Sequence, residues 1–264
     1  MPKVENGAAP VGLQFGKEMG TLALPGEEIG KLVDTTPPHG LQSPQDQKRA
    51  VVRLGSGVTQ RGSSLLSSKA GKVCFDGRRN KTWVENNQKR YVPALEDMVI
   101  GVVEERHSED VRLDINGTDT ATLSSLAFEG ATKKNRPHLD IGSLIYCRIT
   151  RASKNMEAEA SCIEPGSNKS WVGGEALYGE LKGGNVIQVS LGLARSLLVP
   201  NGPVLTTLGA KIPFQSAVGV NGRVWIQSSS TEHTVLLSIA IAKADTMPAD
   251  EWKAFVKKML EQAT

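Results

Sequence analysis

The chain has 264 residues, of which 39% are apolar and 5% aromatic, with 27 glycines and 13 prolines. This composition is globular and excludes collagen-like and wholly disordered chains, and the many turn formers favour several small β-rich domains over one large enzyme core. The net charge of +3 is too small to require a polyanionic partner unless the cations are clustered.

The N-terminal part is predicted to hold a flexible tail and a small β domain. Residues 1–20 show no periodicity, which indicates the tail. Residues 21–93 show short alternating runs separated by turns, which indicate an all-β domain with a long loop at Asp34–Gln47. Its strands are expected at Leu22–Leu24, Ala50–Leu54, Lys72–Phe75 and Thr82–Glu85.

This first domain is basic in its second half. Between Pro44 and Tyr91 there are eleven Lys or Arg residues and three Asp or Glu residues, which gives a local charge of +8. Such a stretch can bind RNA, bind an acidic protein, or form a solvated face of the strands, and the sequence leaves these possibilities open.

Residues 94–165 are predicted to form a five-stranded barrel of the OB type. Five short strands in about 70 residues are typical of this fold. The strands are expected at Met98–Val103, Val111–Ile115, Thr120–Leu123, Ser143–Thr150 and Ala158–Ile163. The longest connection is expected between Ser124 and Gly142, and a loop of this length in a small barrel is usually functional or disordered.

Residues 166–264 are predicted to form an α/β module after a Gly-rich linker at 166–184. Strands are expected at Val186–Ser190, Pro213–Val218 and Arg223–Ser228, and helices at Leu191–Val199, Thr231–Asp245 and Met247–Gln262. Thr246 is expected to cap the last helix, whose apolar stripe begins at Trp252. The fold class is therefore multidomain and mostly β, with a C-terminal α/β module.

The chain offers no catalytic or cofactor-binding template. Its four histidines are far apart, and it contains no HExxH, GxSxG or P-loop motif. Its three cysteines, Cys74, Cys147 and Cys162, form neither a disulfide framework nor a CxxC metal half-site. We expect no enzymatic activity, no cofactor and no bound metal, and a reducing compartment.

No membrane association is expected either. The first residues lack the apolar core of a signal peptide, and the longest apolar stretch, Val235–Ala242, is much shorter than a membrane span. The sequence therefore predicts a soluble intracellular protein.

The barrel's long loop is the strongest binding signal. Lys133, Lys134 and Arg136 place three cations within four positions, an arrangement suited to neutralising RNA phosphates without reading sequence. The alternative is a basic loop that faces solvent or a protein partner. Two further cations, Arg148 and Arg151, can extend the same track or can pair with Glu104, Glu105 and Asp140.

Few aromatic residues are available for base stacking in this barrel. Single-strand-binding barrels use exposed aromatic side chains as stacking platforms. The candidates here are Phe128, Tyr146 and His138. We expect the isolated barrel to bind RNA weakly.

The sequence Gly219-Val220-Asn221-Gly222, followed by Arg223, has two interpretations. A KH domain grips four nucleotides with a GxxG loop between two helices. Here the flanking residues are predicted strands, and Asn-Gly is the commonest type I′ hairpin turn, so the turn interpretation is favoured over RNA clamping.

Four motifs in the same order resemble the S1/KH cap subunits of the eukaryotic RNA exosome. They are Leu24-Pro-Gly-Glu27, Arg90-Tyr-Val-Pro93, the run from Phe128 to Pro137, and the run from Gly219 to Trp225. The resemblance covers nearly everything after about residue 20. The absence of a zinc-ribbon cysteine set argues against the cap type that lacks a KH domain.

The resemblance implies an N-terminal domain, an S1 barrel and a KH-like module on a six-subunit ring of RNase PH-like proteins, beside other cap subunits. The cap would itself be inactive and would guide single-stranded RNA to separate nuclease subunits, for ribosomal RNA processing and RNA turnover in the nucleus, nucleolus and cytoplasm. Lys133, Lys134 and Arg136 would face the channel mouth, and the Gly219–Gly222 motif would be mainly structural.

Two other functions are compatible with the same sequence. The protein can be a purely structural clamp whose basic surfaces meet acidic partners, or a free-standing S1/KH RNA-binding factor that is active as a monomer.

Overall fold

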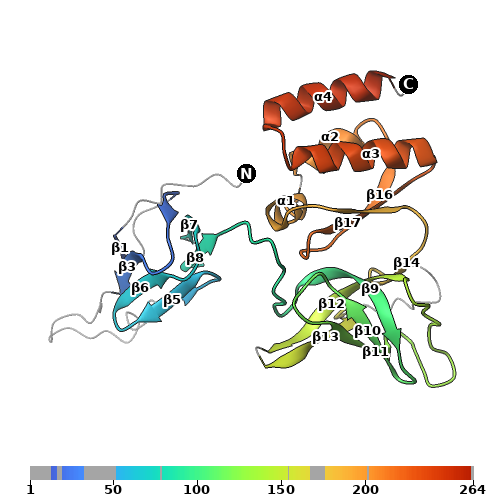
Figure 1. Ribbon diagram of the computed structural model, residues 1–264, viewed down its shortest axis with the longest axis horizontal. Coiled ribbons are helices and arrows are strands. Elements are labelled where there is room, and N and C mark those ends of the chain that lie inside the picture. Colours follow the sequence, from blue (N-terminus) through green and yellow to red (C-terminus); the bar gives the residue numbers. More distant parts are fainter. Residues whose placement is uncertain are drawn as a thin grey trace. The chain divides into compact units, whose positions relative to one another are not determined.

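A computed structural model describes residues 13–16, 20–32, 52–77, 79–153, 155–166, 176–200 and 202–262. The chain divides into two compact units, Met1–Asn87 and Gln88–Thr264 (Figure 1). The expected Asp34–Gln47 loop and most of the expected tail lie outside the described residues. So do three of the eleven cations of the basic stretch, namely Lys48, Arg49 and Arg78.

The described part of the first unit contains two four-stranded sheets. One has the order β1-β3-β6-β5 and consists of β1 (Leu13–Phe15), β3 (Glu28–Leu32), β6 (Ser64–Ser67) and β5 (Val58–Arg61). The other has the order β2-β7-β8-β4 and consists of β2 (Leu22–Ala23), β7 (Gly71–Asp76), β8 (Lys81–Glu85) and β4 (Arg53–Leu54). Ala23, Ile29, Leu65 and Val73 form a small buried core.

The predicted strands of this unit correspond to the second sheet and miss the first. Strands β3, β5 and β6 are short and rich in Gly, Ser, Thr and Gln, so they carry no clear apolar alternation. Strand β1 lies within the residues where the sequence predicts a tail. Three residues are too few to show an apolar period. The strand is defined by its antiparallel pairing with β3, in which Leu13 is the partner of Leu32.

The second unit begins with the predicted five-stranded barrel. Its strands are β9 (Met98–Arg106), β10 (Asp110–Asp114), β11 (Ala121–Phe128), β12 (Leu144–Ser153) and β13 (Met156–Cys162). The order is β13-β11-β10-β9-β12, and pairing between β12 and β13 closes the barrel. A sixth strand, β14 (Gly179–Leu181), joins the open edge of β12, within the segment predicted to be a linker.

Strand β11 is longer than the sequence predicts. It continues past Leu123 to Phe128 through a register shift, and Phe128 pairs with Cys162 of β13. Phe128 is only 2% exposed, and burial of its ring stabilises the extension of β11 to this residue. The long loop therefore begins at Glu129 instead of Ser124.

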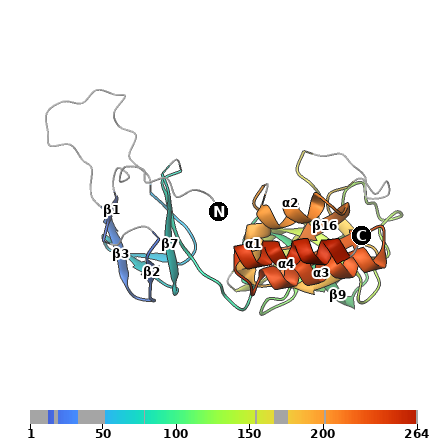
Figure 2. The same ribbon diagram turned by 90° about the horizontal axis from the view of Figure 1, so that it is seen from above.

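The C-terminal module is built on a three-stranded antiparallel sheet of order β15-β17-β16. Its elements are β15 (Asn185–Gln188), α1 (Leu191–Leu197), α2 (Pro203–Gly209), β16 (Phe214–Val218), β17 (Arg223–Ser228), α3 (Thr231–Ala244) and α4 (Ala249–Gln262). Figures 1 and 2 show α3 over this sheet and α4 on the outer side of α3. The predicted strands and the helices α1, α3 and α4 are confirmed, whereas α2 is not predicted.

The last helix packs as its apolar stripe predicts, but it begins differently. Trp252 and Val256 are buried, and the Trp252 indole N–H donates to the Ala240 carbonyl of α3 (2.8 Å). The predicted cap is wrong, because the Thr246 hydroxyl donates to the Lys243 carbonyl at the end of α3. Among the described residues, no helix is long and apolar enough to cross a membrane.

The barrel and the three-stranded sheet share one apolar core. Leu191 of α1, Ala217 of β16 and Trp225 of β17 belong to the same buried cluster as the barrel residues Ile100 and Leu113. Burial of this shared apolar surface holds the two modules together as one unit.

Candidate nucleic-acid interface

The β11–β12 loop presents two lysines on a tight turn. The Thr132 N–H donates to the Asn135 carbonyl (2.9 Å), and the Asn135 N–H donates to the Thr132 carbonyl (3.1 Å). Lys133 and Lys134 occupy the two central positions of this segment, Thr132–Asn135, which we call the lysine turn. Both side chains are exposed and make no ion pair within the described part of the chain. They are therefore available to an external anion.

The loop is fixed to the turn between β9 and β10. The Arg136 guanidinium donates to the Ser108 carbonyl (2.7 Å), and the Arg106 guanidinium lies 3.0 and 3.1 Å from the two ring nitrogens of His138. Leu139 is buried below the loop. These contacts restrict the loop and so fix the direction in which the lysine turn projects.

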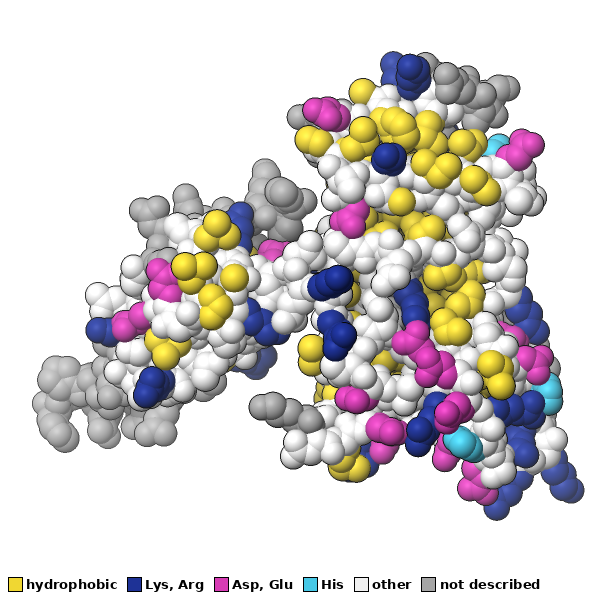
Figure 3. Space-filling view, in the orientation of Figure 1, with side chains coloured by type: hydrophobic (Ala, Val, Ile, Leu, Met, Phe, Trp, Pro, Cys, Tyr) yellow, Lys and Arg dark blue, Asp and Glu magenta, His cyan; other side chains and the backbone are white. Residues whose placement is uncertain are grey.

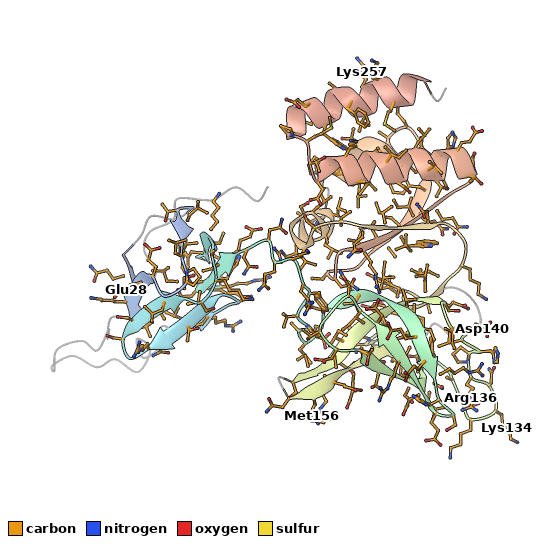
Figure 4. All side chains as sticks on the ribbon, viewed as in Figure 1. Glu28, Lys134, Arg136, Asp140, Met156 and Lys257 are labelled. Carbon is orange, nitrogen blue, oxygen red and sulfur yellow. The ribbon has the colours of Figure 1, made fainter. Side chains whose placement is uncertain are left out.

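The result is a cationic corner of the barrel. It consists of Arg106, Lys133, Lys134 and Arg136, with His138 among them. Figure 3 shows Lys and Arg side chains gathered at this corner of the second unit, and Figure 4 shows Lys134 and Arg136 projecting from it beside Asp140. Arg106 is not predicted from the sequence. It is the last residue of β9, far from the loop in sequence, and it reaches His138 only in the folded barrel.

Arg148 forms an ion pair instead of adding a free cation to this corner. Its Nη1 atom lies 2.6 Å from both carboxylate oxygens of Glu96, and the Arg148 side chain is only 15% exposed. The predicted alternative partners, Glu104, Glu105 and Asp140, are wrong for this residue, because strand register places Arg148 beside Met98 of β9 and so near Glu96.

Arg151 is paired as well, and it lies elsewhere on the barrel. Its guanidinium is 2.9 Å from Glu159, its partner in the β12–β13 register, and 3.6 Å from the Met156 sulfur. Figure 4 shows Met156 at the opposite side of the barrel from Lys134. The predicted continuous track from the loop to Arg151 is therefore wrong.

The expected stacking aromatics are inside the protein. Phe128 is 2% exposed and Tyr146 is 7% exposed, with the Tyr146 ring centroid 5.4 Å from that of Tyr178. His138 is exposed but lies against Arg106. The outward Arg112 of β10 lies between Glu105 and Glu157, at 3.8 Å from each. This surface favours phosphate contact at the lysine turn over base stacking.

The Gly219–Gly222 segment is a hairpin turn, as the flanking strands predict. Strands β16 and β17 pair on either side of it, and the Gly222 N–H donates to the Gly219 carbonyl (3.1 Å). The turn is not of type I′, which needs positive φ at both central residues. Of these four residues only Gly222 has positive φ, at 82°. This geometry is a turn followed by a left-handed glycine, which permits a bulge.

Asn221 inserts this turn into the barrel. The side chain is fully buried, with the oxygen accepting from the Ile100 N–H (3.3 Å) and the amide nitrogen donating to the carbonyls of Ile100 and Ile115 (2.9 Å each). The Val220 N–H donates to the Met98 carbonyl (2.8 Å). The amide thus completes hydrogen bonds of β9 and of the residue after β10.

Gly219 and Arg223 lie against the same barrel strands. A Cβ atom on Gly219 would come within 2.8 Å of the Ile100 nitrogen, so only glycine fits without a shift. The Arg223 guanidinium donates to the carbonyls of Ile100 (3.2 Å) and Asp114 (2.5 Å) and pairs with the Asp114 carboxylate. The side chains of Asn221 and Arg223 are therefore committed to the barrel.

In a KH module the nucleotide-gripping loop lies between two helices. Here the connection between α1 and α2 runs from Leu198 to Gly202 and reads Leu-Val-Pro-Asn-Gly. It has a single glycine and lacks the first glycine of a GxxG motif.

Comparisons with known proteins point to a single family. Residues 91–173 match the family model "Exosome complex component RRP40, S1 domain", residues 184–232 match "KH domain", and residues 52–90 match "Exosome complex exonuclease Rrp40 N-terminal domain". Three successive segments of the chain thus match in the order that the motifs predict.

Relatives over most of the length agree with these matches. The chain is 39% identical to the exosome complex component rrp40 of Schizosaccharomyces pombe over 216 residues, covering 80% of this chain and 88% of the relative. It is 38% identical to RRP40 of Drosophila melanogaster over 226 residues (84% and 88%) and 32% identical to RRP40 of Homo sapiens over 256 residues (92% and 91%).

A solved structure shares the fold. It is described as a candidate exosome complex RNA-binding protein, and it superimposes with a TM-score of 0.54 at 19% sequence identity. The match covers 67% of this chain and all of the solved chain. Within the exosome caps, the Phe128–Thr132 and Asn221–Trp225 runs indicate the "forty" type of the ribosomal-RNA-processing series, and the relatives confirm this prediction.

Proposed function

Because the chain belongs to the RRP40 family of exosome complex components, we propose that it is an RNA-binding cap subunit of an RNA exosome. In this role it contacts RNase PH-like ring subunits and the other caps, stabilises the ring, and guides single-stranded RNA toward separate nuclease subunits. The 3′-to-5′ reaction is theirs, and this chain is not an enzyme. The complex serves ribosomal RNA processing and RNA turnover in the nucleus, nucleolus and cytoplasm.

The observation that carries this proposal is the lysine turn. Lys133 and Lys134 project from a loop fixed by Arg136 and Arg106, and neither lysine makes an ion pair within the described ranges. Two exposed ammonium groups on a fixed turn, without an ion pair, attract phosphates of any sequence, and counterions are released when they bind. Arg136 keeps part of its donor capacity, because only one of its nitrogens bonds Ser108.

The arrangement of the other residues agrees with low sequence specificity. Phe128 and Tyr146 are buried and Arg112 lies between two carboxylates, so the described barrel surface offers no exposed Phe, Tyr or Trp on which bases can stack. We interpret the Gly219–Gly222 turn as mainly structural, because the side chains of Asn221 and of the following Arg223 donate hydrogen bonds to the barrel. RNA guidance by this chain is therefore led by phosphate contacts and is weak without neighbouring subunits.

The test is a charge reversal in a reconstituted exosome. Lys133→Glu with Lys134→Glu removes two phosphate contacts and adds repulsion, so we expect RNA affinity and 3′ processing through the channel to fall by about tenfold or more at moderate salt. The matched control is Lys253→Glu with Lys257→Glu on α4, which reverses two exposed charges. Figure 4 shows Lys257 far from Lys134 within the second unit.

The outcomes separate guidance from a structural role. Normal assembly with impaired RNA protection in the lysine-turn variant, and normal behaviour of the α4 variant, supports guidance. Unchanged RNA protection and processing by a correctly assembled lysine-turn variant contradicts it.

A structural clamp is the second candidate function. It is favoured by the ion pairs Arg148–Glu96 and Arg151–Glu159, which use up two of the predicted RNA contacts. In that case the lysine-turn variant fails to assemble with the ring, and RNA protection is lost only together with assembly.

A further inference from the structure

We propose that the outer face of the β2-β7-β8-β4 sheet, in the first unit, is a second binding site for single-stranded RNA, formed by Arg53, Lys81 and Trp83. It is separate in sequence and in fold from the lysine turn. It extends the proposed function, because it adds a contact that the barrel does not provide.

The two cations lie side by side at one edge of this sheet. Arg53 of β4 and Lys81 of β8 are direct partners in the parallel register. Both side chains are exposed and neither makes an ion pair in the ranges that the structure describes. Neighbouring strands are only about 5 Å apart, and like charges placed directly opposite each other are destabilising. On its other side Lys81 has Asp76 of β7 as its register partner, but Asp76 lies 3.9 Å from Arg79 and makes no ion pair with Lys81, so an anion bound between Arg53 and Lys81 relieves their repulsion.

Trp83 lies on the same face as Lys81. Side chains alternate along β8, with Thr82 and Val84 buried and Lys81, Trp83 and Glu85 on the outer face. Trp83 is only partly buried, and its indole N–H has no hydrogen-bond partner among the described residues.

The other described tryptophans are different in both respects. Trp225 and Trp252 are at most 5% exposed, and each indole N–H donates to a carbonyl (2.8 Å in both cases). Trp83 is therefore more exposed than the other two described tryptophans and keeps a free indole donor, as tryptophans at binding surfaces do.

A glycine keeps the neighbouring strand from covering this ring. Gly55 follows β4, and a Cβ atom at this position would lie 2.7 Å from the Trp83 Cβ. Any larger residue would press on Trp83 from the β4 side. With glycine there, the residue after β4 adds no side chain against Trp83, and the Lys81 side chain passes beside it, with its Cε atom 3.1 Å from where a Cβ atom would stand.

The carboxylates on this face have their own contacts. Asp76 lies 3.9 Å from Arg79, and Glu85 accepts from the Cys74 thiol (3.6 Å). Three cations lie on this face with the two acids, namely Arg53, Lys72 and Lys81, and Arg79 lies in the turn between β7 and β8. The net charge is positive, and it is most concentrated at the β4 edge.

This combination fits RNA better than an acidic protein. Unpaired cations beside one accessible aromatic ring on a flat sheet are the elements of sequence-tolerant single-strand binding. The two most exposed large apolar side chains in the described part of this unit, Leu22 (75%) and Leu24 (65%), belong to β2 and the residue after it, at the opposite edge of the sheet, whereas Leu54 of β4 is only 37% exposed. A protein partner that buries apolar area would favour that edge instead.

The test uses the full-length chain and a fluorescently labelled oligouridine, with affinity measured at several salt concentrations. Arg53→Gln with Lys81→Gln should lower the slope of log affinity against log salt by about 1.4, which is two phosphate contacts on a single strand. Trp83→Leu should weaken binding about tenfold, whereas Trp83→Phe, which keeps a stacking ring, should stay close to the native protein. The charge-matched control is Arg61→Gln with Lys89→Gln, which removes two exposed charges outside this sheet, one from β5 of the first unit and one from the first residues of the second unit.

The outcomes distinguish this site from the lysine turn. If Arg53, Lys81 and Trp83 variants bind as the native protein does while Lys133→Glu with Lys134→Glu does not, this inference is wrong and the proposed function stands. The reverse pattern supports this site and contradicts the lysine turn. An equal loss in the control variant, or Trp83-dependent binding of polyglutamate in place of oligouridine, overturns the assignment to RNA.

Discussion

All three tyrosines of the chain resist ionisation in the folded protein. Burial is the main cause for each of them. It raises the pKa of Tyr146 to about 12, helped by the nearby Tyr178 and Cys147. The pKa of Tyr91 is raised further by its hydrogen bond to the Asp97 carboxylate (2.7 Å), and that of Tyr178 is also raised.

This predicts a coupled alkaline transition. The ordinary tyrosine pKa is about 10, so between about pH 10 and pH 12 the unfolded chain loses phenolic protons that the folded chain retains. The free energy of unfolding should therefore fall as pH rises through this window. Tyrosinate absorbance should appear together with the loss of near-ultraviolet circular dichroism. A smooth titration near pH 10 with native dichroism intact contradicts the burial of these rings.

At the scale of residues, sequence reasoning identified local clusters and missed long-range ones. Lys133, Lys134 and Arg136 are visible because they lie within four positions. Arg106 is not, since its place beside His138 depends on how β9 meets the loop. The pairing of Arg148 with Glu96 depends on strand register, which composition does not reveal.

At the scale of elements, the Gly219–Gly222 turn joins the two modules of the second unit. Its buried amide bonds the backbone of β9 and of Ile115, and Arg223 adds contacts to Asp114. A buried backbone group left without a partner costs about 1–3 kcal/mol. The turn therefore has a large effect on stability for its size.

We predict that Asn221→Ala lowers the free energy of unfolding by roughly 3 kcal/mol or more. The substitution leaves three buried backbone groups without a hydrogen-bond partner, namely the Ile100 N–H and the carbonyls of Ile100 and Ile115. The measurement is urea unfolding at neutral pH. Asn185→Ala, which removes one amide contact to Ser238 at an exposed position, is the control and should cost less than about 1 kcal/mol. A loss no larger than that of the control would show that the turn does not hold the modules together.

Elements within a clear apolar pattern could be predicted, including the short α1, β2 and β4, and elements without such a pattern could not. The barrel strands and α4 have enough residues to show alternation or an apolar stripe. Helix α2 has seven residues and β14 has three, and both depend on neighbours for their order. The hairpin at Asn221 was predictable from its strands, but its turn type was not, because the side chain is held by a distant strand.

At the scale of the whole molecule, the near-neutral chain separates its charges by location. Most barrel cations that lie near carboxylates are paired, as Arg112, Arg148 and Arg151 are. Lys133 and Lys134 of the lysine turn make no ion pair within the described residues, and neither do Arg53 and Lys81 in the first unit. The sequence predicted the domain types, because four motifs in order are specific, but it could not show which cations remain unpaired.

The central claim is that RNA contacts the lysine turn, and crosslinking tests it most directly. RNA containing 4-thiouridine is bound to the assembled exosome, irradiated, and the crosslinked peptides of this subunit are identified by mass spectrometry. We predict crosslinks concentrated in the β11–β12 loop around Lys133 and Lys134, reduced by Lys133→Glu with Lys134→Glu. RNA that is bound yet crosslinks to the outer face of β10 and β11, with none in the loop, would contradict the account.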